Sequence, residues 1–406
     1  MYYTLYMQQP LQSVCIVGRQ PALGLAELES LYGGDHVRSV ASQVAGLDLH
    51  AHDVNFKRLG GSTRLAHVLA VLPTQDWKRL ERQLPQLTTE LALTLPDGKI
   101  QLGLSSIGLN VSAAKLNACA LGLKKVLRAK TDRSVRVTPN PEPELNTAQV
   151  LHNHLAGPTG IELLLIAADD GSTVIARTTA VQDIDSYTRR DRGRPKRDAR
   201  VGMLPPKLAQ IIINLATGPV TPTPEKILLD PFCGTGVVLQ ESMLMGLSVY
   251  GTDLEPRMID YSRTNLDWLI AGADDLQSEI LLEPGDATSH RWQPVPDFVA
   301  GETYLGRPFT QHPNAEVLAQ TVSEVNLILK RFLQNLRGQL PAGARLCLGV
   351  PAWQVRPGQF KHLPLIDQMG DLGYNRTRFE HVRDEQLLYY REDQIVARQV
   401  LVLTRK

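Results

Sequence analysis

The sequence predicts an α/β protein in which a doubly wound parallel sheet forms the C-terminal half and smaller α+β regions precede it. From residue 226 onward, short apolar runs alternate with amphipathic stretches at the spacing of strands and helices. The first run leads into a glycine-rich turn, DPFCGTG at 230–236, where ligands of open α/β sheets bind. The last two apolar runs, at 387–390 and 396–406, predict an antiparallel pair of strands at the edge of that sheet.

Length and composition are those of a multidomain globular protein. The chain has 406 residues, of which 43% are hydrophobic and 21% charged, so two or three domains are expected. No basic residue precedes Arg19 and no run of about 18 apolar residues occurs, so we expect no signal peptide and no membrane partner. The cysteines are far apart and lack metal-ligand spacing, which predicts a cytoplasmic protein without a metal site.

The N-terminal 180 residues mix strand-like and helix-like patterns and predict two small α+β regions. In the first, strands are expected at 4–7, 13–18 and 37–49, with helices at 23–32 and, after a Gly-Gly turn, through residue 73. In the second, helices are expected at 77–87, 112–129 and 147–155, and strands at 91–95, 100–105, 134–139 and in the hairpin 161–180.

Basic residues are concentrated in two segments, although the net charge is only +1. Six basic residues and one acid lie within 124–136, and eight basic residues and two acids lie within 186–207. Such segments either bind a polyanion through phosphate contacts or are solvated surface, and charge alone leaves both interpretations open. Residues 181–204 are also polar and weakly periodic, which predicts a basic linker.

The turn at 230–236 has the form of a cofactor-binding loop. Asp230 ends a strand-like run, and Gly234 and Gly236 remove side chains that would keep a ligand away from the backbone. The helix that follows can receive a carboxylate at its N-terminus. Asp230 can hold an ammonium group, directly or through water.

Two further acids distinguish this loop from a dinucleotide fingerprint, whose third glycine it lacks. Asp253 ends the next strand and can accept hydrogen bonds from both ribose hydroxyls, and Asp286 follows the third strand and can accept from an adenine amino group. Together, these strand-end acids predict S-adenosylmethionine bound to a class I (Rossmann-like) methyltransferase fold. The candidate cofactor-binding residues are Asp230, Phe232, Gly234, Thr235, Gly236, Asp253, Leu254, Asp286 and Ala287.

The segment LLDPFCGTGVVLQESMLMGLSVYGTDLEPRMIDYSRTNL at 228–266 resembles the archaeal and eukaryotic THUMP-domain tRNA guanine-N2 methyltransferases, which modify the guanine at position ten. Other parts of the chain resemble the same family in the same order. They are IVGRQPALGLAELESL, RLGGSTRLA, SAAKLNACALGLKKVLRAKTDRSVRV, NTAQVLHNHL and GRPKRDARVGMLPPKLAQIIINLA. The resemblance therefore covers most of the sequence.

This resemblance implies that a THUMP region binds the tRNA and that the basic linker lies along the bound tRNA. The implied domains are an N-terminal ferredoxin-like domain at 1–75, a THUMP RNA-binding domain at 76–180, the linker at 181–204 and the methyltransferase domain at 205–406. The implied RNA-binding candidates are Lys124, Lys125, Arg128, Arg136, Arg192, Arg194 and Arg197.

The chain departs from this family at the catalytic motif, where an acid or Asn, two prolines and an aromatic follow the fourth strand. Here the strand DFVAG is followed by ETYLG at 302–306. Three interpretations stay open: Glu302 accepts from the target amine and Tyr304 stacks on the base, the site serves another acceptor, or the fold binds cofactor or RNA without catalysis. Arg307 and Phe309 in the next loop either contact RNA or are ordinary surface residues.

The sequence therefore predicts a tRNA methyltransferase that transfers a methyl group from S-adenosylmethionine to the exocyclic N2 of a guanine, at position 10 in the resembled family. The competing classes are a non-catalytic tRNA-binding protein and an amino-methyltransferase with a different nucleic-acid target. We expect a monomer. The sequence leaves open a small activating protein subunit, mono- versus dimethylation and the target nucleotide.

Overall fold

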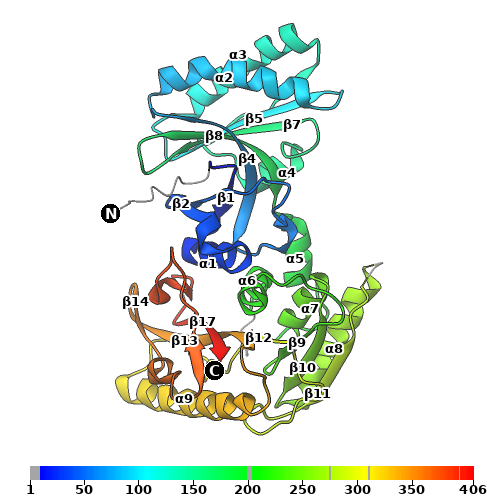
Figure 1. Ribbon diagram of the computed structural model, residues 1–406, viewed down its shortest axis with the longest axis vertical. Helices are drawn as coiled ribbons and strands as arrows, with labels where there is room; N and C mark the ends of the chain where they lie inside the picture. The colour runs from blue at the N-terminus through cyan, green and yellow to red at the C-terminus, as the bar shows by residue number, and fades with distance from the viewer. Residues whose placement is uncertain (1–9, 199–203, 274–275, 310, 393) are drawn as a thin grey trace, which may run out of the picture. The chain divides into compact units, whose positions relative to one another are not determined.

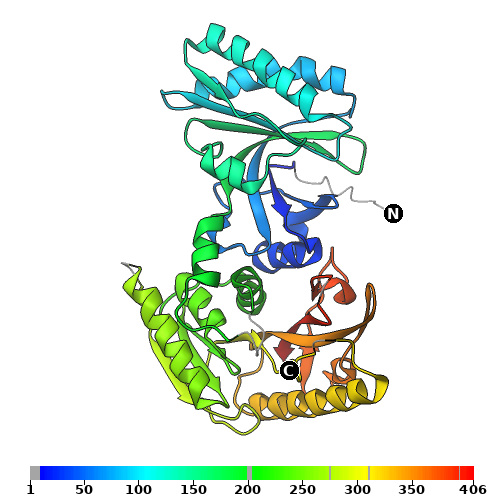
Figure 2. The same ribbon diagram turned by 180° about the vertical axis from the view of Figure 1, so that it is seen from behind.

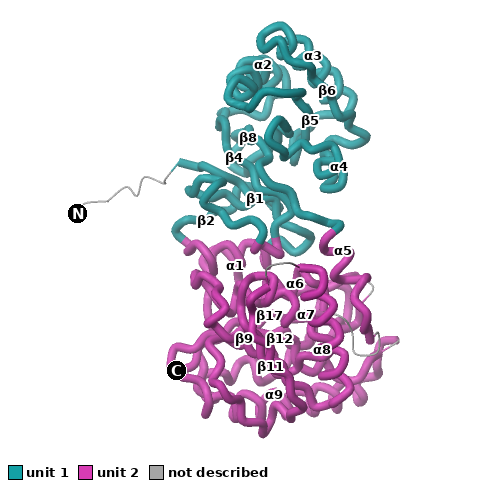
Figure 3. Tube along the Cα trace, turned by 90° about the vertical axis from the view of Figure 1, so that its right-hand side faces the viewer, with its two compact units in different colours: residues 1–21, 35–57, 62–185 teal, residues 22–34, 58–61, 186–406 magenta. Residues whose placement is uncertain are grey.

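The computed structural model describes residues 10–198, 204–273, 276–309, 311–392 and 394–406. The strand expected at 4–7 lies outside these residues. The chain divides into two compact units (Figure 3): the first contains residues 1–21, 35–57 and 62–185, and the second contains residues 22–34, 58–61 and 186–406. The subdivision of the N-terminal half into ferredoxin-like and THUMP domains stays a prediction.

In the described part of the first unit, one eight-stranded sheet runs in the order β2-β3-β1-β4-β8-β7-β5-β6. Strand β5 is parallel to β7 and β6, and the other neighbours are antiparallel. Helices α2 and α3 lie side by side on one face (Figure 1). The elements are β1 (Ser13–Val17), β2 (Val37–Ala41), β3 (Val44–Leu47), β4 (Ser62–Leu72), α2 (Trp77–Thr94), β5 (Ile100–Ile107), α3 (Ala113–Thr131), β6 (Val135–Val137), α4 (Thr147–His152), β7 (Gly160–Ala167) and β8 (Thr173–Val181).

The helix expected after the Gly-Gly turn is wrong, because this segment forms the long strand β4. Its leucines and valines recur at a spacing that suits a helix, but β4 is an inner strand with apolar groups packed on both faces. Ala66 and Val68 pack in one cluster, whereas Leu69 and Leu72 pack beneath α2 and α3.

The strand expected at 91–95 is also wrong, because α2 continues through this segment. The buried residues of α2 are spaced four apart, from Leu80 and Leu84 to Thr88 and Ala92, so one helical face covers the sheet to the end of the run. The expected helix at 112–129 and the expected hairpin of β7 and β8 are confirmed.

In the described part of the second unit, the sheet runs in the order β11-β10-β9-β12-β13-β17-β15, with β14 and β16 attached to β13 and β17. The first five of these strands are parallel and β17 is antiparallel to β13. The elements are α1 (Pro21–Tyr32), α5 (Ile184–Arg192), α6 (Pro206–Thr217), β9 (Ile227–Asp230), α7 (Val237–Leu244), β10 (Ser248–Asp253), α8 (Pro256–Ala271), β11 (Ile280–Pro284), β12 (Phe298–Glu302), α9 (Ala315–Arg337), β13 (Arg345–Arg356), β14 (Gln359–Lys361), β15 (Tyr374–Arg376), β16 (Leu388–Tyr389) and β17 (Val396–Arg405).

Helices cover both faces of this sheet, as the predicted doubly wound fold requires (Figure 2). Alternate residues of one strand point to opposite faces. In β9, Leu229 packs in the cluster beneath α9, and Leu228 packs in the cluster beneath α6 and α7. In β13, Leu348 and Cys347 divide in the same way. The fold is therefore the Rossmann-like fold that the sequence predicts.

A buried acid ties the N-terminal helix α1 to the second unit. Glu27 accepts hydrogen bonds from the backbone N–H groups of Gly60 and Gly61 and from Asn214 Nδ2 of α6, at 2.7–2.9 Å. Burial raises the pKa of Glu27 to about 7. Because α1 comes from the N-terminal segment, residues far apart in the sequence complete this unit.

The C-terminal part and the basic segment differ in detail from expectation. Strand β16 pairs with β17 as expected, but β17 lies inside the sheet, between β13 and β15, and is not an edge. The sequence also predicts a helix at 361–369, where the structure has only a short 3-10 helix, Pro364–Gln368. Helix α5 lies in the segment that the sequence presents as a linker. None of the helices in the described residues is long and apolar enough to cross a membrane.

Candidate active site

The glycine turn lies between the end of β9 and the start of α7. Gly236 is the N-cap of α7 and has a φ of 81°, and a Cβ there would lie 2.9 Å from Ser262 Oγ of α8. Helix α8 supports the turn: Ser262 Oγ donates to Gly234 O, and Asn265 Nδ2 donates to Thr235 O, both at 2.9 Å. No side chain caps the N-terminus of α7, which leaves its first N–H groups to a ligand.

Asp230 lies at the carboxyl end of β9 and is almost completely buried, at 2% exposure. Its Oδ1 accepts from Phe232 N at 3.1 Å. A Cβ at position 301 would lie 2.4 Å from this oxygen, so Gly301 of β12 makes the room for the carboxylate. Burial raises the pKa of Asp230 well above its ordinary value, and the charges of Asp253 and Glu302 act in the same direction. A cationic ligand would relieve this cost.

Asp253 and Asp286 lie at the ends of the next two strands, as the sequence predicts. Asp253 Oδ2 accepts from Gly234 N at 2.9 Å and its Oδ1 accepts from Glu255 N at 3.0 Å. Burial raises the pKa of Asp253. Asp286 is exposed, and its Oδ1 accepts from Thr288 N at 2.9 Å. Both carboxylates are therefore held in place by backbone groups beside the glycine turn.

These side chains line one cavity of about 710 Å³ in the second unit. Eight of the nine candidate cofactor-binding residues lie in its wall; the ninth, Gly236, does not and instead shapes the turn. Both catalytic candidates, Glu302 and Tyr304, also line it. The predicted residues in the wall are Asp230, Phe232, Gly234, Thr235, Asp253, Leu254, Asp286, Ala287, Glu302 and Tyr304.

Glu302 forms an ion pair that the sequence analysis missed. Its Oε1 lies 2.8 Å from Nε of Arg398 on β17, and the two side chains are only 13% and 7% exposed. Burial raises the pKa of Glu302, and Arg398 acts against that rise. The signal in the sequence is a single charged residue inside the apolar strand run VARQVLVL.

The loop after β12 presents an aromatic ring to the cavity. Tyr304 is 44% exposed, whereas Thr303 is buried and donates its N–H to Gly349 O at 2.9 Å. Arg307 lines the cavity and its Nε donates to Thr321 Oγ1 of α9 at 3.2 Å. Phe309 is partly buried against the core, so it supports the loop.

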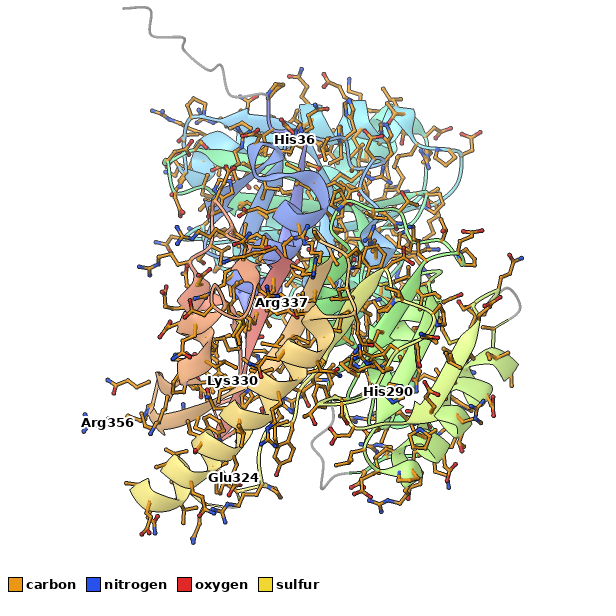
Figure 4. The ribbon with its side chains drawn as sticks, turned by 60° about the horizontal axis from the view of Figure 1, so that its bottom comes forward. His36, His290, Glu324, Lys330, Arg337 and Arg356 are labelled. Carbon is orange, nitrogen blue, oxygen red and sulfur yellow. The ribbon has the colours of Figure 1, made fainter. Side chains whose placement is uncertain are left out.

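Part of the remaining wall of the cavity comes from residues that no pattern in the sequence marks. Helix α9 contributes Leu327, Ile328 and Arg331. The loop that carries Asp286 continues to His290, which Figure 4 labels. Its Nε2 lies 3.0 Å from Glu283 Oε1. The surface positions of a long helix look alike in sequence. Which of them line the cavity is therefore determined by the tertiary fold and could not be predicted.

The RNA-binding candidates are divided between the two units. Lys124 and Arg136 line a second cavity of about 430 Å³ in the first unit, together with Lys99. Lys125 and Arg128 are exposed on α3. In the second unit Arg192 and Arg197 are exposed. Arg194 differs, because its side chain is 3% exposed, and in this conformation it is closed to RNA.

Comparisons with known proteins relate this chain to methyltransferases. Residues 194–278, which include the glycine turn, match the family described as RMKL-like, methyltransferase domain. The tRNA (guanine(10)-N2)-dimethyltransferase of Methanothermobacter thermautotrophicus is 31% identical over 151 residues, covering 37% of this chain and 39% of that protein. The enzyme of the same name from Pyrococcus abyssi is 38% identical over 85 residues, covering 21% and 22%. The chain thus spans less than half the length of these curated relatives.

Among solved structures, TrmN from Thermus thermophilus is similar, with 18% sequence identity and a TM-score of 0.48 over 98% of this chain and 100% of that chain. The family match covers the part of the second unit in which the turn, Asp230 and Asp253 lie together. Residues 194–278 of the second unit, which hold the glycine turn, Asp230 and Asp253, are therefore similar to the RMKL-like methyltransferase domain.

Proposed function

We propose that this protein is an S-adenosylmethionine-dependent tRNA methyltransferase that acts on the exocyclic N2 of a guanine, at position 10 of the tRNA. The observation that carries the proposal is that Asp230, Asp253 and Glu302 face one cavity beside the glycine turn and the free N-terminus of α7. The names of the relatives supply the tRNA guanine. The four cysteines are buried and form no disulfide in the described part of the chain, which supports the cytoplasmic location that we propose with this function.

The residues of the cavity fit the methyl donor group by group. Asp230, whose pKa is raised by burial, would hold the α-ammonium, and the N-terminus of α7 would receive the carboxylate. Asp253 would accept from the ribose hydroxyls, and Asp286 from the adenine amine. Leu254 is 68% exposed at the cavity wall and would cover the adenine ring. The cofactor would supply a methyl group on a positively charged sulfur.

The acceptor side of the cavity fits an exocyclic amine. As the N–C bond forms, the S–C bond breaks with its electron pair left on sulfur, and the nitrogen must release one proton. Glu302 would orient the amine and accept that proton, because its Oε2 is free of the ion pair that engages Oε1. Tyr304, exposed at the same wall, would stack on the base.

Substitution of Glu302 tests this assignment. With labelled cofactor and an unmodified tRNA transcript, Glu302→Gln should lower the single-turnover rate about 100-fold, and Glu302→Ala more, since an amide accepts a hydrogen bond but takes no proton. Affinity for S-adenosylhomocysteine should change little. Unchanged methylation in both variants would contradict the role of Glu302. Cofactor binding by the wild-type protein without label in tRNA would refute the enzyme itself.

A non-catalytic tRNA-binding protein is the second candidate, because ETYLG replaces the motif of the resembled family. Mass spectrometry of tRNA from a deletion strain separates the two. A methylated guanine that disappears on deletion and returns with the wild-type gene, but not with a Glu302→Ala gene, supports the enzyme. It also identifies the nucleotide and the number of methyl groups.

A further inference from the structure

The ion pair between Glu302 and Arg398 bridges two strands that are not neighbours. In the register of the sheet, Glu302 of β12 lies opposite Gly349 of β13, and Arg398 of β17 lies opposite Pro351. Positions 349 and 351 point to the same face of β13. Next-nearest strands are about 10 Å apart, so only long side chains such as those of Glu302 and Arg398 meet across β13. Gly349 has no side chain that would lie between them.

The pair engages only one side of the carboxylate. Arg398 Nε donates to Glu302 Oε1 at 2.8 Å, and in the described part of the chain this is the one ion pair of each residue. Glu302 also lines the cavity. The ion pair thus fixes one oxygen of a carboxylate that lines the cavity and leaves the other oxygen outside the pair.

The surroundings of Glu302 otherwise oppose its ionisation. Burial raises the pKa of Glu302, and the charge of Glu302 in turn adds to the rise in the pKa of Asp230. Arg398 is the described basic residue that acts against the rise at Glu302. Arg307 and Arg331 line the same cavity, but neither forms an ion pair with Glu302.

We propose that Arg398 is a positioning residue for methyl transfer, which keeps Glu302 ionised and fixes its Oε1 so that Oε2 meets the amino group of the target base. This inference rests on the function proposed above. The ion pair would fix the acceptor side chain at the place where this chain lacks the two prolines of the resembled motif.

The test compares Arg398→Gln and Arg398→Lys with the wild-type protein across pH 5.5 to about 9.5, by single-turnover transfer of labelled methyl groups to a tRNA transcript. In Arg398→Gln the acidic limb of the rate profile should move up by about one pH unit or more, since Glu302 loses its cation. Activity near neutral pH should fall about tenfold and recover partly at high pH. Arg398→Lys should keep most of the wild-type profile.

Two controls separate this role from a structural one. Arg405→Gln, at the end of the same strand, removes an equal charge outside the cavity and should leave the profile unchanged. In a Glu302→Gln background, Arg398→Gln should cause no further shift. The inference would be overturned if Arg398→Gln lowered the rate by the same factor at every pH. It would also be overturned if Arg398→Gln still moved the acidic limb in the Glu302→Gln background.

A readout without turnover keeps this inference separate from the proposed function. Carboxyl ¹³C NMR of glutamate-labelled protein with bound S-adenosylhomocysteine follows the titration of Glu302, assigned by its loss in Glu302→Gln. The midpoint should rise in Arg398→Gln and stay near the wild-type value in Arg398→Lys. An unchanged midpoint in Arg398→Gln overturns the inference. A raised midpoint in a protein that never methylates tRNA supports the effect of Arg398 on the ionisation of Glu302, and it overturns the proposed function together with the role of Arg398 in methyl transfer.

Discussion

In the first unit the buried carboxylate of Glu162 is bound on both oxygens, whereas in the second unit the buried carboxylate of Asp230 faces a cavity. Glu162 Oε1 accepts from Arg64 Nη1 at 3.0 Å and from Ser105 Oγ at 2.5 Å, and its Oε2 accepts from Thr178 Oγ1 at 2.6 Å. Asp230 accepts one hydrogen bond, from Phe232 N. Burial raises the pKa of Glu162 and of Asp230 alike, so a shifted pKa does not identify a site. The open side of the carboxylate does.

Removing Arg64, which pairs with Glu162 in the first unit, should give the largest change in stability. Arg64→Ala leaves Glu162 buried without its cation, which costs about 3–5 kcal/mol. Urea unfolding monitored by circular dichroism measures the loss. The double variant Arg64→Met/Glu162→Leu should recover much of it, since no charge stays buried. Affinity for S-adenosylhomocysteine should not change in either variant, and a large loss of affinity would contradict a purely structural role.

Removing an acid from the cavity of the second unit should have the opposite result: a loss of affinity for S-adenosylhomocysteine rather than a loss of stability. Asp253→Ala should weaken S-adenosylhomocysteine binding about 100-fold, or about 2.7 kcal/mol, because charge-assisted bonds to the ribose are lost and Gly234 N loses its acceptor. Asp286→Ala, at an exposed position, should cost about tenfold. Isothermal titration calorimetry measures both. If Asp253→Ala destabilised folding as strongly as Arg64→Ala but bound cofactor normally, Asp253 would belong with Glu162.

The parts of this site that follow strand ends could be predicted from the sequence, because local order fixes them. A strand, a glycine turn and a helix place Asp230 next to the turn, and the parallel order of β9, β10 and β11 brings Asp253 and Asp286 to the same edge. Arg398 could not be placed in this way. Its contact with Glu302 depends on β17 entering the sheet between β13 and β15, and no local pattern encodes that position.

The same limit explains the errors in the fold. Helix spacing and strand spacing coincide in β4, because an inner strand needs apolar residues on both faces. Helix α1 comes early in the sequence, and no local pattern indicates that Glu27 accepts a hydrogen bond from Asn214 of α6. Burial of Arg194 is a third case: a basic segment predicts exposed charge, but the tertiary fold covers one guanidinium.

The smallest expected effect concerns basic side chains that are not fully buried in the core of either unit. Lys124→Gln/Arg136→Gln removes two basic residues from the wall of the cavity in the first unit. We expect tRNA affinity to fall about tenfold and the slope of log affinity against log salt to decrease by about two, one for each phosphate contact. Filter binding at several salt concentrations measures both, and affinity for S-adenosylhomocysteine should not change.

The matched control is Lys78→Gln/Arg82→Gln, which removes the same charge from exposed positions on α2. Arg133 would be a poor control, because it donates to three backbone carbonyls near the end of α2 and its loss would disturb the fold. If the α2 pair weakened tRNA binding as much as the α3 and β6 pair, the attraction would be diffuse. The first unit would then guide tRNA through its overall field, and the contacts that select the target guanine would lie in the second unit, beside Tyr304 and Glu302.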